Sequence, residues 1–326
     1  MKGSYQIIIQ NSLVQFKLRI NRNITIIRGD SGTGKTTMVN LVRQYSLDGA
    51  ASGVNISCDK TCTVLSGLRW ENEIKSIHDS IIFLDEGFSF ISSKEFARAV
   101  KASDNYFVIA TRETLFNLPY SIKEIYGLKN VTRKTKYQEF NRIYSEFYPI
   151  YDEKLSRVKP DTVIVEDSNS GYQFFSALCN KEKIRCFSAK GKTKIYDAIN
   201  KCKDEIILVI ADGAAFGPEM ERVISLRKTK NLIYFLPESF EWLILKSRLI
   251  DGSRIQDILE HPYDFIESKK YFSWERFFAA LLTDETKDTY MKYSKSELNT
   301  AYLNQKEVNA IKGVVKEMVD GAKKQF

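Results

Sequence analysis

The sequence contains no apolar run that approaches the roughly 20 residues a helix needs to cross a bilayer. Its first residues, MKGSYQIIIQNSLVQF, alternate apolar and polar side chains and lack the cleavage pattern of a signal peptide, so they predict a β-strand. Internal repeats and low-complexity stretches are also missing. We therefore expect a protein without a membrane segment, located in the cytoplasm.

Cysteine is scarce and lacks the spacing of metal ligands. Cys58 and Cys62 lie four residues apart, but no second pair of Cys or His accompanies them. A zinc site is therefore not expected, and the odd number of scattered cysteines fits reduced thiols in a cytoplasm. The five are Cys58, Cys62, Cys179, Cys186 and Cys202.

A large excess of one charge is absent as well. The 326 residues include 49 Lys and Arg against 41 Asp and Glu, which gives a formal net charge of +8. The basic residues are spread out, apart from a run at residues 133–136 and the pair Lys323 and Lys324. This balance permits a polyanionic partner such as DNA or RNA without requiring one. The length and the 43% hydrophobic content are those of an ordinary globular protein of about two domains.

A glycine-rich segment follows the apolar run at residues 24–27. It reads GDSGTGKT, the G-x-x-x-x-G-K-[ST] pattern of a P-loop, whose inward backbone N–H groups and following helix N-terminus bind phosphate. Lys35 is predicted to contact the β- and γ-phosphates, and the Thr36 hydroxyl to ligate Mg²⁺. The alternative is a plain Gly/Ser-rich turn. The predicted nucleotide-binding residues are Gly29, Asp30, Ser31, Gly32, Thr33, Gly34, Lys35, Thr36 and Thr37.

A second run of apolar residues, 81–84, ends in the carboxylates Asp85 and Glu86. After a P-loop in the same domain, this arrangement is the Walker B pattern. Asp85 is predicted to hold the Mg²⁺ shell, and Glu86 to orient or deprotonate the attacking water. The pair therefore indicates hydrolysis of a nucleotide, with ATP as the expected one, although a P-loop does not distinguish ATP from GTP.

A further strand is predicted over residues 105–110 and ends at Thr111 and Arg112. Thr111 is a candidate sensor of the γ-phosphate, and Arg112 a candidate for stabilising transition-state charge. A simple strand cap with a surface arginine explains the two residues equally well. Because strands alternate with helices, we predict an α/β fold with a parallel sheet over residues 1–150, with the phosphate site at the carboxyl ends of its strands.

The second half repeats the alternation of strands and helices. Strands are predicted at residues 162–166, 184–188, 205–210 and 231–236, which indicates a second small α/β domain over residues 160–245. Residues 246–326 read as a helical C-terminal region. A stripe of apolar residues near its end is predicted to pack against other helices or to form a homo-oligomer; it consists of Val308, Ile311, Val314, Val315 and Met318.

Two strands of this second domain end in acidic residues, Glu166 and Asp212. Parallel strands bring such residues to one edge, where their oxygens can share a divalent metal ion. Together with Gly191 and Lys192, these residues resemble the Toprim domain of topoisomerases, primases and OLD-family nucleases. The resemblance implies metal-dependent chemistry on nucleic acid, but Ala214 stands where that family has a second aspartate. Asp167, Glu219 or Glu238 would have to replace it; alternatively, the acids cap strands and bind no metal.

A P-loop ATPase domain followed by a Toprim-like domain resembles, in its architecture, the OLD-type ATPase-nucleases and related phage-defence ATPases. The leading hypothesis is therefore Mg²⁺-dependent ATP hydrolysis that controls the Toprim-like domain, acting on nucleic acid. One alternative is an ATP-sensing regulatory or defence module that acts through partner proteins. Another is a small-molecule P-loop kinase, against which Glu86 and the lack of an arginine-rich lid argue.

Overall fold

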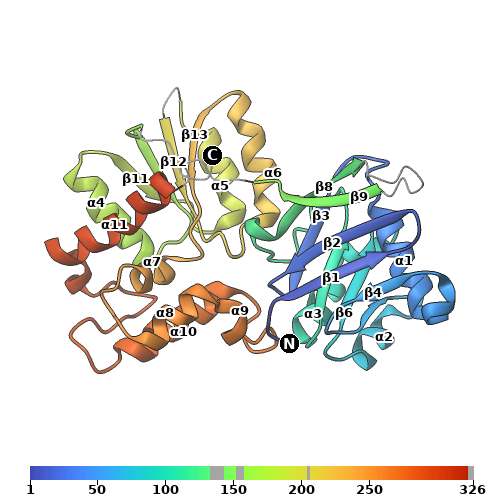
Figure 1. The fold of residues 1–326 in the computed structure, drawn as a ribbon. Helices are drawn as coiled ribbons and strands as arrows, with labels where there is room; N and C mark the ends of the chain where they lie inside the picture. Colours follow the sequence, from blue (N-terminus) through green and yellow to red (C-terminus); the bar gives the residue numbers. More distant parts are fainter. Residues whose placement is uncertain (133–142, 152–157, 204–205, 322–326) are drawn as a thin grey trace. The chain divides into compact units, whose positions relative to one another are not determined.

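The computed structural model describes residues 1–132, 143–151, 158–203 and 206–321. The chain forms two compact units, one of Met1–Tyr151 with Tyr263–Phe272 and the other of Asp152–Pro262 with Ser273–Phe326. Both units combine helices with a sheet (Figure 1), which confirms the predicted α/β class. Within the described ranges, no helix is long and apolar enough to cross a membrane. The five cysteines all lie in these ranges and are free thiols.

The first unit is built on a nine-stranded sheet with the order β4-β1-β2-β9-β8-β3-β7-β6-β5 (Figure 1). Strands β8, β3, β7, β6 and β5 run parallel, and β2 runs parallel to β9. The strands are β1 (Tyr5–Gln10), β2 (Val14–Ile20), β3 (Ile24–Arg28), β4 (Asn55–Ser57), β5 (Cys62–Val64), β6 (Ile81–Asp85), β7 (Tyr106–Ala110), β8 (Ile125–Thr132) and β9 (Ile143–Pro149).

The predicted parallel sheet holds for the strands around β3, but the sheet as a whole is mixed because three strand pairs are antiparallel. They are β4 with β1, β1 with β2, and β8 with β9. A short turn after β1 reverses the chain, with the Asn11 side chain accepting from the backbone N–H of Leu13 and of Val14, and such a connection forces antiparallel pairing. The sheet is therefore mixed, with its parallel part around β3.

Helices cover both faces of the parallel strands, which explains why these strands are apolar throughout. Helix α1 (Lys35–Asp48) packs in one core with Ile27 and Phe83, and helix α3 (Lys94–Ala102) packs in another with Ile26 and Leu84. Helix α3 begins where the Ser93 hydroxyl accepts from the backbone N–H of Phe96 at 3.0 Å. The remaining helix of this region is α2 (Trp70–Ser76).

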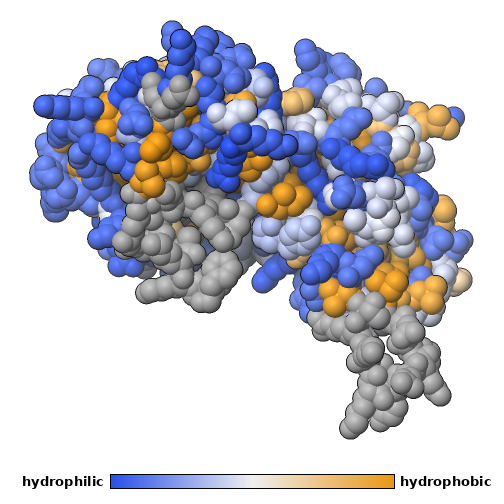
Figure 2. Space-filling model, turned by 90° about the horizontal axis from the view of Figure 1, so that it is seen from above, coloured by the Kyte–Doolittle hydropathy of each residue, from blue (hydrophilic) through white to orange (hydrophobic). Residues whose placement is uncertain are grey.

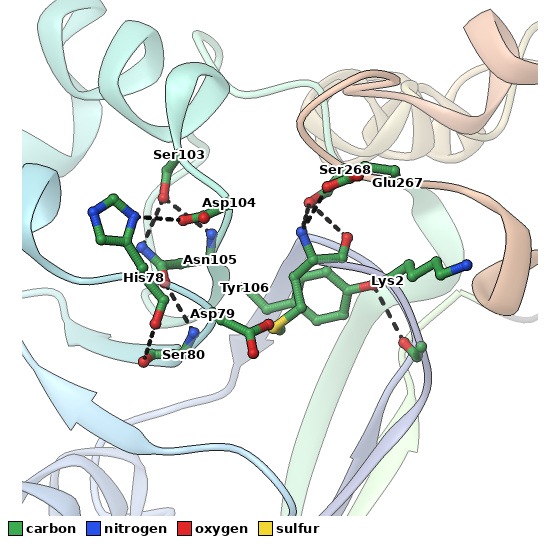
Figure 3. Close-up of polar contacts among 12 residues, drawn as sticks. Lys2, His78, Asp79, Ser80, Ser103, Asp104, Asn105, Tyr106, Glu267 and Ser268 are labelled. Carbon is green, nitrogen blue, oxygen red and sulfur yellow. Dashed lines mark hydrogen bonds and ion pairs between the residues drawn. The ribbon is translucent and has the colours of Figure 1, made fainter.

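A short segment from late in the chain, Tyr263–Phe272, belongs to the first unit. The ammonium group of Met1 donates to Glu267 Oε1 at 3.1 Å and to Ser268 Oγ at 3.2 Å (Figure 3). The Ser268 hydroxyl donates to the Met1 carbonyl at 2.9 Å, and Asn23 Nδ2 donates to the Phe272 carbonyl at 3.0 Å. These contacts lie at the amino-terminal edge of the sheet, because Asn23 directly precedes β3.

The second unit contains a four-stranded, wholly parallel sheet with the order β11-β10-β12-β13. Its strands are β10 (Thr162–Val165), β11 (Arg185–Ser188), β12 (Ile206–Ile210) and β13 (Asn231–Phe235), and the helices between them are α4 (Ser170–Lys181), α5 (Ile195–Asn200) and α6 (Gly217–Ser225). The four β/α elements expected from the sequence are therefore confirmed.

The helices that follow β13 begin with α7, which contacts α8, α10 and α11. Of the predicted apolar stripe on α11, Val308, Ile311 and Val314 are buried. The helices are α7 (Phe240–Lys246), α8 (Ser253–Glu260), α9 (Pro262–Phe265), α10 (Trp274–Thr286) and α11 (Gln305–Gly321). Short 3-10 helices occur at Gly49–Ser52, Ser89–Ser92, Ile122–Glu124, Lys192–Lys194, Leu226–Lys228 and Thr300–Leu303.

The surface seen in Figure 2 is mainly hydrophilic, with hydrophobic residues in small separate patches. In the described part of the chain, the large hydrophobic side chains that are exposed come from both units. They are Leu13, Leu47, Leu68, Phe116, Ile143, Tyr148, Val158 and Tyr290.

Candidate functional site

The glycine-rich loop, residues 29–36, connects the end of β3 to the start of α1. Gly32 and Gly34 have φ angles of +82° and +99°, a region that strains residues with a side chain. Lys35 is 5% exposed, and its Nζ donates to the carbonyls of Gly29 at 2.5 Å and of Asp30 at 2.9 Å. The loop thus curls around the ammonium group of its own lysine.

The N-terminus of α1 faces this loop without a capping side chain. Gly34 is the N-cap residue and makes no side-chain hydrogen bond, and the first turn contains no acidic residue. Thr36 and Thr37 are exposed in that turn. The positive end of the helix dipole and its unpaired N–H groups are therefore open to an anion.

The strand register brings the predicted catalytic residues to the same edge of the sheet as the loop. Strand β7 lies between β3 and β6, and Ala110 of β7 is paired with Ile27 on one side and Asp85 on the other. Glu86 directly follows Asp85, and Thr111 directly follows Ala110. The loop, the two carboxylates and Thr111 with Arg112 are thereby brought to the carboxyl ends of three adjacent parallel strands.

Glu86 and Arg112 form an ion pair with each other. Arg112 donates to Glu86 Oε1 from Nη2 at 2.7 Å and from Nε at 2.9 Å, and its backbone N–H donates to Oε2 at 3.1 Å. Partial burial works to raise the pKa of the Glu86 carboxyl, but these hydrogen bonds and the Arg112 charge outweigh it, so the pKa lies below its ordinary value. The charge of Lys35 lowers the same pKa further.

Thr111 is buried, and its hydroxyl takes part in the turn that follows β7. The hydroxyl accepts from the backbone N–H of Glu113 at 3.0 Å and donates to the Glu113 carbonyl at 3.3 Å. The backbone N–H of Thr111 donates to the Ile27 carbonyl at 3.0 Å. In this arrangement the hydroxyl has the role of a strand cap, which is one of the two roles expected for it.

Sequence reasoning missed one part of this site, the strands β8 and β9 beside the glycine-rich loop. They form one side of a pocket of about 700 Å³ whose other side is the loop. The alternation in IYSEFYP at Ile143–Pro149 was an available strand signal. The pocket is lined by Ser31, Gly32, Thr33, Leu128, Lys129, Asn130, Glu146, Phe147 and Tyr148.

In the second unit, the structure brings Glu166 and Asp212 together. They follow the neighbouring strands β10 and β12, and the backbone N–H of Asp212 donates to Glu166 Oε2 at 3.0 Å. Burial raises the pKa of Glu166 to about 7, and it raises that of Asp212 well above its ordinary value. Lys192 lies nearby, donating to the Ala215 carbonyl at 2.9 Å, and burial lowers its pKa.

The acids proposed to replace the missing aspartate have different surroundings. Asp167 Oδ1 accepts from the backbone N–H of Tyr172 at 2.8 Å, near the start of α4. Glu219 is 2% exposed, and its Oε2 has no hydrogen-bond partner among the described residues. Glu238 is buried. Across the ranges that the structure describes, no group of three or more His, Cys, Asp or Glu side chains is arranged to hold a metal ion.

Glu275, in the first turn of α10, is a further acidic residue of this cluster that sequence reasoning missed. Its charge raises the pKa of Asp212 and of Glu166, and its Oε1 pairs with Lys295 Nζ at 2.5 Å. Because it lies far along the chain from both strands, no local pattern linked it to them. The basic run at residues 133–136 and the pair Lys323 and Lys324 lie outside the described residues.

Comparison with known proteins leaves this site to be interpreted from its own residues. No family model matches the chain. A search of curated proteins finds no match either.

Proposed function

We propose that the first unit is a P-loop nucleoside triphosphatase that binds ATP with Mg²⁺ and hydrolyses it. The observation that carries the proposal is the register of β3, β7 and β6. It puts the glycine-rich loop, Asp85 with Glu86, and Thr111 with Arg112 at one edge of the sheet. If the loop were a plain Gly/Ser-rich turn, nothing would require Asp85 and Glu86 to lie beside it at the same edge of the sheet.

The open N-terminus of α1 and the loop N–H groups receive the phosphates in this proposal. Lys35 exchanges its hydrogen bonds to the Gly29 and Asp30 carbonyls for phosphate oxygens. The Thr36 hydroxyl and the Asp85 carboxylate are hard oxygen ligands, which fit Mg²⁺, an ion that proteins hold with one or two such groups plus phosphate oxygens. When bound, Mg²⁺ neutralises charge that develops on the phosphates.

Glu86 is the group that orients the attacking water, and Arg112 holds its carboxylate until nucleotide is bound. The hydrogen bonds and charge of Arg112 lower the pKa of Glu86, so Glu86 becomes a stronger proton acceptor when Arg112 leaves it. Three hydrogen bonds from Arg112 hold this carboxylate, two from the guanidinium group and one from the backbone N–H. Transfer of Arg112 from Glu86 to phosphate oxygens would both release the base and stabilise the transferring group.

Two substitutions test the proposal. Lys35→Ala is expected to abolish ATP binding, measured by isothermal titration calorimetry with MgATP, and Glu86→Gln to bind ATP while phosphate release stops. Lys101→Ala, which changes an exposed lysine of α3, is the matched control and is expected to behave as the unaltered protein. Unchanged phosphate release by Glu86→Gln would remove the role assigned to Glu86.

A second candidate function belongs to the second unit, a Toprim-like, metal-dependent activity on nucleic acid controlled by the nucleotide. The adjacency of Glu166 and Asp212, with pKa values raised by enclosure, favours it because a bound cation would stabilise both ionised carboxylates. Cleavage of plasmid DNA or of RNA with Mn²⁺ or Mg²⁺, lost in Glu166→Gln and in Asp212→Asn, is the expected result. If no nucleic acid is cleaved with either metal, an ATP-controlled module that acts through partner proteins becomes the better description.

A further inference from the structure

The connection between β4 and β5 joins the two ends of the nine-stranded sheet. These strands are the outermost members of the sheet, yet only residues 58–61 link them. Such a link spans at most about 18 Å, whereas nine strands laid flat would separate their outer members by about 38 Å. The sheet therefore curves around α1, which contacts β1, β4, β5 and β6. Neither of the functions proposed above uses this closure of the sheet.

A cysteine thiol lies at each end of the connection. Cys58 directly follows β4, and Cys62 is the first residue of β5. The Cys62 thiol points back across the connection and donates to the Lys60 carbonyl at 3.7 Å. The Cys58 sulfur accepts from the backbone N–H of the same Lys60 and from the Cys62 side chain, and these hydrogen bonds lower the Cys58 pKa. Both sulfurs thus lie over residue 60 and beside each other.

Contacts with the start of β6 hold the connection in this shape. The Thr61 carbonyl accepts from the backbone N–H of Ile81 at 2.8 Å. The Lys60 ammonium group forms an ion pair with the Asp79 carboxylate, two residues before that strand. The backbone that carries the two thiols is therefore fixed at its centre, and the sulfurs are adjacent without any change of fold.

The two thiols differ in exposure and in acidity. Cys58 is half-buried, whereas Cys62 is 7% exposed. The hydrogen bond from Cys62 is the main cause that lowers the pKa of Cys58 to about 7, against the opposing effect of burial, and it raises the pKa of Cys62. At neutral pH a large share of Cys58 is therefore thiolate, the nucleophilic form, while Cys62 keeps its proton. An accessible thiolate with a second cysteine beside it is the arrangement found in redox-sensitive pairs.

We propose that Cys58 and Cys62 are a modification site that forms a reversible disulfide in the presence of a peroxide, with Cys58 reacting first and Cys62 resolving. The proposal is independent of nucleotide binding. The bond ties the two outermost strands of the curved sheet together beside α1. The Ser46 hydroxyl of α1 donates to the Cys62 carbonyl at 3.4 Å, so this helix lies directly against the site.

The reaction has two steps, and hydrogen peroxide is its oxidant. In the first, the Cys58 thiolate attacks one peroxide oxygen, the O–O bond breaks, and hydroxide leaves a sulfenic acid on Cys58. In the second, Cys62 loses its proton and its sulfur attacks the Cys58 sulfur. The S–S bond forms, the S–O bond breaks, and the departing hydroxide takes up the proton as water. The two sulfurs are oxidised, the peroxide is reduced to water, and a small dithiol reverses the change.

The test treats the full chain with hydrogen peroxide, blocks the remaining thiols with iodoacetamide, and maps tryptic peptides by mass spectrometry without a reductant. Trypsin cleaves after Lys60, between the two cysteines, so a disulfide holds peptides 44–60 and 61–69 together. The expected product is this linked pair, lighter than its reduced peptides by the two hydrogens that the bond removes. Dithiothreitol is expected to separate it. In Cys62→Ser, the sulfenic acid on Cys58 is expected to persist and to be trapped by dimedone.

The other cysteines provide controls. Cys202→Ser changes a buried thiol and is expected to leave the linked pair unchanged. Cys179 and Cys186 form a second hydrogen-bonded pair, but its thiol of lowered pKa, Cys179, is 7% exposed and is therefore expected to react at higher peroxide concentrations.

Three results would overturn the proposal. One is the absence of the linked pair from the peroxide-treated, unaltered protein. Another is a sulfinic or sulfonic acid on peptide 44–60 while peptide 61–69 stays reduced, because Cys62 would then not resolve the sulfenic acid. The third is linkage of Cys179 with Cys186 at lower peroxide than linkage of Cys58 with Cys62, because the accessibility of Cys58 would then not select the site.

Discussion

Replacing Glu166 by Gln is expected to stabilise the second unit at neutral and alkaline pH, although it alters a proposed functional residue. The amide keeps an oxygen that can accept from the backbone N–H of Asp212, a contact of 3.0 Å, and removes a charge that is costly to enclose. It also removes one of the negative charges that raise the pKa of Asp212.

The magnitude follows from the pKa of Glu166, which burial raises from 4.5 to about 7. A group that holds its proton more tightly in the folded state stabilises fully below pH 4.5, and this contribution is lost as pH rises through about 7. At about 1.4 kcal/mol for each pKa unit, the loss reaches about 3 kcal/mol, and the partial exposure of Glu166 reduces it toward 1–2 kcal/mol. Glu166→Gln is therefore expected to be more stable by about 1–2 kcal/mol at pH 8 and to differ little at pH 4.5.

Urea unfolding in EDTA, followed by tryptophan fluorescence, measures this difference. The chain has three tryptophans, and in a Trp70→Phe background the remaining two, Trp242 and Trp274, both report on the second unit. Glu260→Gln changes an exposed carboxylate of α8 and is the control, with no change in the pH dependence expected. If Glu166→Gln is no more stable at pH 8, or loses stability with pH as steeply as the unaltered protein, the enclosed carboxylate is not a source of instability and the reasoning is wrong.

Three further predictions concern the first unit. Arg112→Ala is expected to raise the pKa of Glu86 toward its ordinary value, because the hydrogen bonds and the charge that lower this pKa are lost. NMR titration of the Glu86 carboxyl measures the change. An unmoved pKa would show that Arg112 does not control the ionisation of Glu86. Gly34→Ala is expected to cost about 1–2 kcal/mol of stability and to weaken ATP binding, because the Gly34 φ of +99° strains any residue with a side chain. Thermal unfolding and ATP titration measure the two effects, with Gly87→Ala as the control because Gly87 has an ordinary φ and open space around it. Equal behaviour of the two variants would contradict the proposed strain at Gly34. Ser268→Ala is expected to destabilise the first unit by about 1–2 kcal/mol, because it removes two hydrogen bonds between Ser268 and Met1. Urea unfolding measures this loss, with Ser92→Ala as the control. Equal stability of the two variants would mean that the bonds to Met1 contribute nothing.

The central strands of both units could be predicted because they are buried on both faces and read as continuous apolar runs. Strands β3, β6 and β7 of the first sheet and β10 of the second belong to this class. Strands β8 and β9 were missed, because their sequences mix apolar with charged and small residues. Their pairing with β3 and β2 depends on contacts between distant parts of the chain.

The candidate site likewise has one part that the sequence predicts and another that only the structure reveals. The residues of the glycine-rich loop are contiguous, and their local pattern already determines how a loop between a strand and a helix folds. The ion pair of Glu86 with Arg112 joins residues 26 positions apart, and it follows from the register of β6 with β7. The position of Glu275 near Asp212 likewise depends on packing that no short segment encodes.

The placement of Tyr263–Phe272 in the first unit has a consequence for how the protein is made. The ribosome delivers the chain from its N-terminus, so the β-sheet of the first unit emerges long before the segment that pairs with Met1 and Asn23. At typical synthesis rates of about 5–20 residues per second, the delay is roughly ten seconds. Until then the Met1 ammonium lacks Glu267 and Ser268. The first unit therefore becomes complete only after most of the second unit has been synthesised, and a fragment ending at residue 151 would represent the nascent state rather than the finished one.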